Sequence, residues 1–175
     1  QTFVMSTRAV DLITKPSFNE GVDVITVRDI RWGRCDIKTT QLFANCLAKS
    51  EAVRAGAGEA WMIDENNIVT EGSSSNAWIV TDNHVLVTRP PTHEILNGIT
   101  RRTIIDIASQ NEVAFEERAF SLEETKRAKE AFFSSATSLA TPVLSIDGVT
   151  IGNGAVGPIT KSLQGQYLQY TQQTS

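Results

Sequence analysis

The chain has 175 residues, 41% of them apolar, and a formal net charge of −4 from 16 Lys and Arg against 20 Asp and Glu. A domain of this size can form a core of its own. The acidic balance, with a pI of about 5.2, argues against the clustered positive field that nucleic-acid binding needs. No apolar run approaches the roughly 20 residues of a membrane-spanning helix.

The predicted elements mix strands and helices without strict alternation. Residues 3–10 alternate loosely and predict a first strand, and the turn-rich stretch 14–21 predicts a connection between domains. Alternating or β-branched segments predict further strands over 22–27, 59–63, 68–70, 77–80, 84–87 and 131–135. Helical spacing and caps predict helices over 39–56, 100–110, 121–128 and 158–172. Strands in runs with helices interspersed indicate an α+β fold.

Several motifs are better explained as ordinary structure than as sites. Residues 152–157 spell G-x-G-x-x-G, but the 18 residues that follow are too few for a dinucleotide-binding unit. His84 and His93 have no second ligand at metal spacing, so no metal site is predicted. Cys35 and Cys46 form no C-x-x-C pattern, which is typical of reduced thiols in a cytoplasmic protein.

Charged residues crowd the segment 28–38, which ends at Lys38 where a strand-like stretch gives way to a helix. A solvated charge cluster is the simpler interpretation. The functional alternative is a nucleophilic lysine that can attack a carbonyl, provided that burial or nearby positive charge disfavours its cationic form. Arg31 and Arg34 are the residues expected to supply that charge.

Three other segments would complete a site around such a lysine. Glu71 follows a strand and precedes small polar residues. Residues 95–101 place a glycine and a hydroxyl at a helix start, which suits an anion, although a plain helix cap is the commoner use. Residues 133–138 offer further N–H and hydroxyl donors. Pyridoxal 5′-phosphate needs an amine for its aldehyde, an acid for its ring nitrogen and hydrogen-bond donors for its phosphate, and these segments offer all three.

These residues resemble the larger, C-terminal domain of the fold-type IV pyridoxal-phosphate-dependent aminotransferases, most of all the D-amino acid aminotransferases. The resemblance rests on four stretches that occur in the family's order, within residues 29–38, 70–76, 95–101 and 141–148. It implies an α+β domain with a mixed, barrel-like sheet and surrounding helices. It also implies pyridoxal 5′-phosphate as the cofactor.

Matched by position, the resemblance implies a role for each site residue. Lys38 matches the catalytic lysine that forms a Schiff base with the cofactor and moves the proton. Glu71 matches the acid that pairs with the pyridine nitrogen, and Leu96 the residue packed on the ring. Arg31 matches a family arginine near the cofactor. The phosphate contacts fall on Ile99, Thr100, Ser135 and Ala136, and because the family usually has threonine at position 136, Thr137 would have to supply the missing hydroxyl.

The implied function is transfer of an amino group between a D-amino acid, or an (R)-amine, and a 2-oxo acid. A branched-chain aminotransferase or an aminodeoxychorismate lyase of the same fold is the alternative. A non-catalytic scaffold is the alternative outside the enzymes, but such a scaffold needs neither Lys38 nor Glu71.

The resemblance also implies a domain organisation. Residues 1–12 would be the last strand of a smaller N-terminal domain, 13–21 the interdomain connection and 22–175 the cofactor-binding domain. The smaller domain, which lies before residue 1 in the family, supplies a phosphate-binding arginine and the groups that hold the substrate carboxylate. The expected partners are small-molecule amino donors and 2-oxo acids, that N-terminal segment and a second copy in a homodimer.

Overall fold

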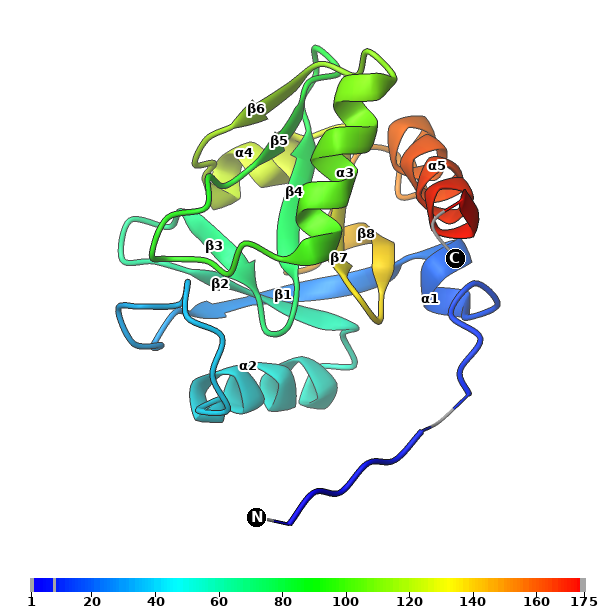
Figure 1. Ribbon diagram of the computed structural model, residues 1–175. Helices are drawn as coiled ribbons and strands as arrows, with labels where there is room; N and C mark the ends of the chain where they lie inside the picture. The colour runs from blue at the N-terminus through cyan, green and yellow to red at the C-terminus, as the bar shows by residue number, and fades with distance from the viewer. Residues whose placement is uncertain (1, 8, 174–175) are drawn as a thin grey trace.

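The strands form one mixed sheet that curls on itself (Figure 1). The computed structural model describes residues 2–7 and 9–173. The strands within these ranges are β1 (Val22–Arg28), β2 (Glu59–Ile63), β3 (Val69–Gly72), β4 (Asn76–Val80), β5 (Leu86–Thr88), β6 (Phe115–Glu117), β7 (Glu130–Ser135), β8 (Leu139–Ile146) and β9 (Val149–Thr150). They pair in the order β3-β2-β1-β8-β7-β4-β5-β6, with β9 beside β8. The edge strand β3 returns to contact β4, which gives the sheet the shape of a half barrel.

Helices cover the outside of the curled sheet. They are α1 (Pro16–Glu20), α2 (Phe43–Arg54), α3 (Ile99–Gln110), α4 (Leu122–Arg127) and α5 (Pro158–Gln173). In Figure 1, α3 and α5 lie side by side, and α2 lies on the far side of β1 and β2. Parallel pairs (β1 with β2 and β8, β5 with β6) occur among antiparallel ones. The predicted α+β class with a mixed, barrel-like sheet is therefore confirmed.

Alternate side chains of the strands enter two different cores. Trp61, Ile79 and Phe133 point into the interior of the curled sheet. Trp78 and Phe132 point outward beneath α3 and α5, where their rings stack 5.4 Å apart. Successive strand residues face opposite sides, so a strand covered on both faces is buried at every position and mostly apolar. This explains why β2 and β4 are buried throughout.

Helix α2 packs through small residues rather than through its large apolar ones. It begins at Phe43, later than the predicted residue 39. Ala48 and Ala52 are buried against β1 and β2, whereas Phe43, Leu47 and Val53 are 78%, 40% and 66% exposed. Alanine lets the helix backbone approach the strands closely, so the larger side chains face away from the sheet.

The predicted strand at residues 3–10 does not form within the described residues. Residues 3–7 and 9–10 have no sheet partner, and Phe3, Val4 and Met5 are 83%, 83% and 74% exposed. A strand needs a neighbour to accept its hydrogen bonds, and the segment runs away from the body of the molecule (Figure 1). The connection predicted at 14–21 contains the short helix α1, with Pro16 at its first position.

Local signals were more reliable elsewhere in the chain. Ser121 caps α4 by accepting a hydrogen bond from the backbone N–H of Glu124, as predicted. Asp147 and Gly148 form the turn between β8 and β9 with positive φ angles of 51° and 76°. Among the described residues no helix is both long and apolar enough to cross a membrane.

The glycine-rich loop at 152–157 has a structural explanation. The backbone at Gly152 has a φ of 55° and lies so close to the Lys129 carbonyl that a Cβ would clash. Gly157 packs in the same way against the side chain of Glu130. The buried Glu130 carboxylate accepts hydrogen bonds from the backbone N–H groups of Ile159 (3.0 Å) and Thr160 (2.8 Å) at the start of α5.

Candidate active site

A buried carboxylate, Glu71, forms the centre of the site. Its side chain is 8% exposed and lies at the end of β3. It accepts hydrogen bonds from the Arg31 guanidinium, from Nδ2 of Asn76 (3.0 Å) and from the backbone N–H of Leu96 (3.2 Å). Asn76 Nδ2 also donates to the Leu96 carbonyl at 2.8 Å. Three of the residues implied by the resemblance, Arg31, Glu71 and Leu96, therefore meet here.

The turn between β3 and β4 holds Glu71 and Asn76 side by side. The Gly72 N–H donates to the Ser75 carbonyl at 2.7 Å, which closes the turn. The hydroxyls of Ser73 and Ser75 both donate to the carboxylate of Glu59, which is 2% exposed. Ser73 and Ser75 therefore anchor the turn in the interior, whereas Ser74 between them is exposed.

Arg31 links the acid to the loop after β1. Its Nε and Nη2 donate to the two carboxylate oxygens of Asp29, at 2.9 Å and 2.7 Å, and its Nη1 pairs with Glu71. Nη2 also donates to the Glu94 carbonyl at 3.1 Å. The Arg31 side chain is only 6% exposed, so every one of these partners compensates a charge removed from water.

The two carboxylates that share Arg31 differ in acidity. Burial raises the pKa of Glu71 to about 7, although the Arg31 charge and hydrogen bond act in the opposite direction. Burial also acts to raise the pKa of Asp29. The hydrogen bonds and the charge of Arg31, together with the hydrogen bond from the Thr70 hydroxyl, nevertheless hold the pKa of Asp29 below its usual range. Glu71 is therefore the carboxylate whose charge is most easily changed.

The start of α3 lies next to this acid. The helix begins at Ile99 and no side chain caps its first turn. Thr100 is 2% exposed, and its buried hydroxyl has no hydrogen-bond partner among residues 2–7 and 9–173. Gly98 sits so close to Asn76 that a Cβ would lie 2.5 Å from the amide oxygen. Asn76 thus connects the acid to the free N–H groups and hydroxyl of the helix start.

The turn between β7 and β8 lies near Asn76, because β7 pairs with β4. Ser134 pairs with Asn76 across the β4–β7 ladder, and the next residue, Ser135, ends β7. Ser135 Oγ contacts the Ser138 hydroxyl at 2.6 Å, while Ala136 and Thr137 are exposed in the turn. A hollow of about 220 Å³ lies beside this turn, and Lys15 and Lys49 are among the residues that line it, with Ser74, Ser135, Thr137 and Ser138.

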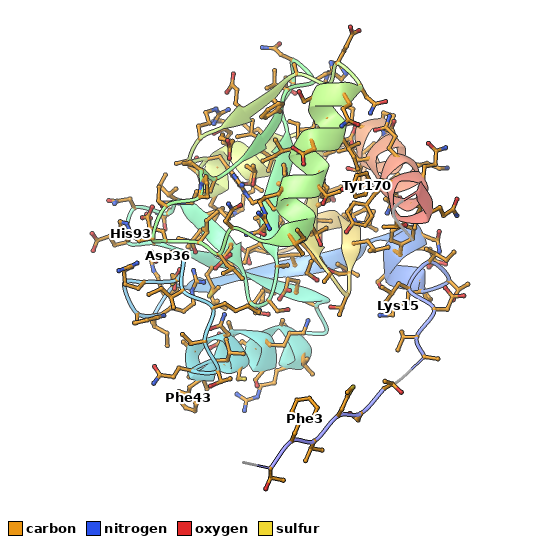
Figure 2. All side chains as sticks on the ribbon, in the orientation of Figure 1. Phe3, Lys15, Asp36, Phe43, His93 and Tyr170 are labelled. Carbon is orange, nitrogen blue, oxygen red and sulfur yellow. The ribbon has the colours of Figure 1, made fainter. Side chains whose placement is uncertain are left out.

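Lys38 is exposed in the segment between β1 and α2. No hydrogen bond or ion pair of the described residues joins it to Glu71. The loop before it is held by a hydrogen bond from the Cys35 N–H to the His93 carbonyl at 2.8 Å, and Figure 2 shows Asp36 close to His93 at this edge of the molecule. Arg31 and Arg34 are paired with Glu71, Asp29 and Asp36. The expectation that they present uncompensated positive charge to Lys38 is therefore wrong.

The comparisons agree with this geometry. Residues 4–146 match the family model described as amino-transferase class IV. The chain belongs to the class IV aminotransferase family. This class IV chain is 43% identical over 155 residues to a D-alanine aminotransferase of Staphylococcus haemolyticus, a match that covers 89% of this chain and 54% of the relative. It is 45% identical over 154 residues to the D-alanine aminotransferase of Bacillus licheniformis, with 87% and 54% covered.

Solved structures of the family show the same fold. The branched-chain amino acid aminotransferase of Escherichia coli superposes with a TM-score of 0.79 at 32% identity, over 90% of this chain and 53% of that one. The branched-chain aminotransferase of Thermoproteus uzoniensis, solved with norvaline, gives a TM-score of 0.79 at 32% identity, over 87% and 51%. This class IV chain thus spans about half the length of the relatives that it matches.

Reasoning from the sequence missed residues that hold this class IV site together. The sequence predicts no role for Asn76 and Asp29, although both lie inside the matching stretches, and it predicts Glu59 only as part of a strand. A carboxylate in a strand that is otherwise apolar, as in Glu59–Ile63, is the signal that could have drawn attention to Glu59. Nothing local marks Asn76, because its partners lie at positions 71 and 96. Among the described residues, no cluster of His, Cys, Asp or Glu could hold a metal ion.

Proposed function

We propose that the protein transfers an amino group between a D-amino acid and a 2-oxo acid, using pyridoxal 5′-phosphate bound by this domain. The observation that carries the proposal is the buried Glu71–Arg31–Asn76 cluster beside the uncapped start of α3. It occurs in a chain 43–45% identical to D-alanine aminotransferases. The identity to the branched-chain enzymes is lower, at 32%.

The residues present fit this cofactor at both of its polar ends. The buried Thr100 hydroxyl has no partner, and a phosphate oxygen at the start of α3 would give it one. Glu71 has a pKa raised to about 7 and would become a good partner for a protonated ring nitrogen. The bound cofactor supplies an electron sink for the carbanion formed at the substrate.

Each side chain then has a defined task. Glu71 would hold a proton at the ring nitrogen, and Leu96, whose N–H donates to Glu71, would pack on the ring. Lys38 would hold the cofactor through its aldehyde and would act as the base that moves the proton at the substrate's α-carbon. The N–H groups of Ile99 and Thr100 and the Thr100 hydroxyl hold the phosphate. The second phosphate contact comes from the turn formed by Ser135, Ala136 and Thr137, where a hydroxyl at 136 is missing.

A branched-chain aminotransferase is the second candidate, because the solved structures with the cited TM-scores of 0.79 are branched-chain enzymes. Those structures establish the fold, which both activities share. Aminodeoxychorismate lyase and (R)-amine transfer use the same arrangement of lysine and acid. The donor preference decides among them.

We further propose that the protein acts as a homodimer and that residues 1–12 belong to a smaller domain, 13–21 to the connection and 22–175 to the cofactor domain. Apolar residues that are 40% exposed or more support both the contact with a second copy and the contact with the smaller domain. Most of them lie in residues 3–5, in the loop before α2 and on α2 itself, as Phe3, Val4, Met5, Ile30, Trp32, Ile37, Leu42, Phe43, Leu47 and Val53; the others are Val10, Ile13, Ile99, Val149 and Tyr170.

The function is tested by the absorption of the bound cofactor in the full protein. With pyridoxal 5′-phosphate added, we expect a near-visible band that changes when D-alanine is added together with release of pyruvate. L-leucine and an (R)-amine serve as competing donors. A faster response to L-leucine would identify a branched-chain enzyme, and a protein that stays colourless would identify a scaffold.

The phosphate end is tested by Thr100→Val, which removes the unpaired hydroxyl and keeps the shape of the side chain. We expect cofactor affinity, measured by absorbance titration, to fall about tenfold because a hydrogen bond to a charged phosphate is lost. Stability without cofactor should stay equal or rise, because an unsatisfied buried hydroxyl is removed. The matched control is Thr103→Val on the same helix, whose hydroxyl already donates to the Ile99 carbonyl. Equal affinities in both variants and wild type would contradict this placement.

A further inference from the structure

Asp29 and Glu71 compete for one guanidinium, and the competition is unequal. Asp29 receives two side-chain hydrogen bonds from Arg31, one from the Arg31 backbone N–H (3.1 Å) and one from the Thr70 hydroxyl (2.7 Å). Glu71 receives a single nitrogen, Nη1. Both carboxylates are nearly buried, at 11% and 8% exposed.

The cluster therefore carries one more negative than positive charge. The groups that act electrostatically on Glu71 are Arg31 and Asp29, and the thiol of Cys35 lies within the same field. A buried surplus charge is unfavourable unless a cation or a proton neutralises it. A proton on the cofactor's ring nitrogen would bring the set of Arg31, Asp29, Glu71 and ring to neutrality.

We propose that Asp29 is a positioning residue for the cofactor acid: by occupying Nε and Nη2 of Arg31, it prevents Arg31 from neutralising Glu71 and so leaves Glu71 to hold the proton on the ring nitrogen. This inference rests on the proposed function, because it assigns the ring nitrogen to Glu71. Without the Asp29 charge, Arg31 and Glu71 would form a neutral pair, and protonation of the ring would create a buried positive charge instead of removing a negative one.

The chain contains a matched control for this arrangement. Arg34 donates through Nε and Nη2 to the two carboxylate oxygens of Asp36 at 2.9 Å and 2.8 Å, the same geometry two residues apart. The side chains of that pair are solvent-exposed, at 56% and 35%. Removing the charge of Asp36 should have no effect on the titration of Glu71, because surface ion pairs are screened by water.

The test follows the ring proton directly, with pyridoxal 5′-phosphate labelled with ¹⁵N at the ring and bound to the full protein. In Asp29→Asn, we expect the pH at which the ring nitrogen loses its proton to fall by about one to two units relative to wild type. Asp36→Asn should leave it unchanged, and Asp29→Glu, which keeps the charge, should restore it. A second readout is the titration of the Glu71 carboxyl in ¹³C-labelled protein without cofactor, which should move to lower pH in Asp29→Asn only.

The outcomes separate this inference from the proposed function. If wild type transaminates D-alanine but Asp29→Asn leaves both titrations unchanged, the positioning role is wrong and the function stands. If Asp29→Asn folds poorly, Asp29→Glu still tests the inference, because a Glu71 titration that differs from wild type in that charge-conserving variant would contradict it. If wild type binds the cofactor without transaminating, the function is wrong, and the Glu71 titration still tests the role of Asp29.

Discussion

Replacing Lys38 with alanine should lower amino transfer from D-alanine to a 2-oxo acid other than pyruvate by at least about 10³-fold, because both the covalent attachment and the proton transfer are lost. Cofactor binding should persist through Glu71 and the phosphate contacts at the start of α3. Borohydride followed by mass spectrometry measures the attachment separately. The cofactor should become fixed to wild type and not to Lys38→Ala.

Lys161→Ala is the control, because Lys161 is an exposed lysine on α5, away from the acid cluster. It should retain wild-type turnover and fixation. Full turnover by Lys38→Ala would contradict the assignment of the catalytic lysine, and so would fixation of the cofactor at another lysine. Lys49, beside the hollow at the β7–β8 turn, is the position to inspect in that case.

Glu71→Gln should lower turnover by about 10²–10³-fold, because a neutral amide cannot hold the proton on the ring nitrogen. Gln keeps the shape of the side chain and can still accept from Arg31 and Leu96, so the fold and the phosphate contacts should remain. Steady-state turnover with D-alanine measures the loss. Glu123→Gln on the exposed side of α4 is the control, with no change expected. Turnover within a factor of two of wild type would contradict the role of Glu71.

Wild type and Glu71→Gln should also differ in how the free energy of unfolding, measured without cofactor, depends on pH. Because the pKa of Glu71 is raised from 4.5 to about 7 in the folded protein, the folded state binds this proton more tightly than the unfolded state. The resulting stabilisation is complete below pH 4.5 and is lost as the pH rises to about 7, a difference of roughly 3 kcal/mol. Asp29, whose pKa is lowered, acts in the opposite sense and only below its unfolded value of 3.8. Urea unfolding at pH 5 and pH 8 should show this loss in wild type and not in Glu71→Gln.

The sequence by itself determined most of the elements and the chemical types of the site. The apolar runs of β2 and β4, the cap at Ser121 and the start of α3 depend on neighbours within a few residues, so periodicity and local chemistry reveal them. The matching stretches also predict Lys38 and Glu71 as site residues, because both belong to short motifs; the structure brings Glu71 together with Arg31 and Leu96, and the role of Lys38 stays a prediction.

The tertiary structure alone decided which groups meet. Arg31 meets Glu71, and Leu96 meets both Glu71 and Asn76, only because the fold brings the loop after β1, the β3–β4 turn and the segment before α3 together. The order of strands, with β8 between β1 and β7, is likewise absent from any local pattern. Pairing across the sheet depends on the packing of the whole core, since contacts between distant residues form only when the complete set of strands is in register. The chemical groups of the site can thus be read from the chain, whereas their charge balance is a property of the fold.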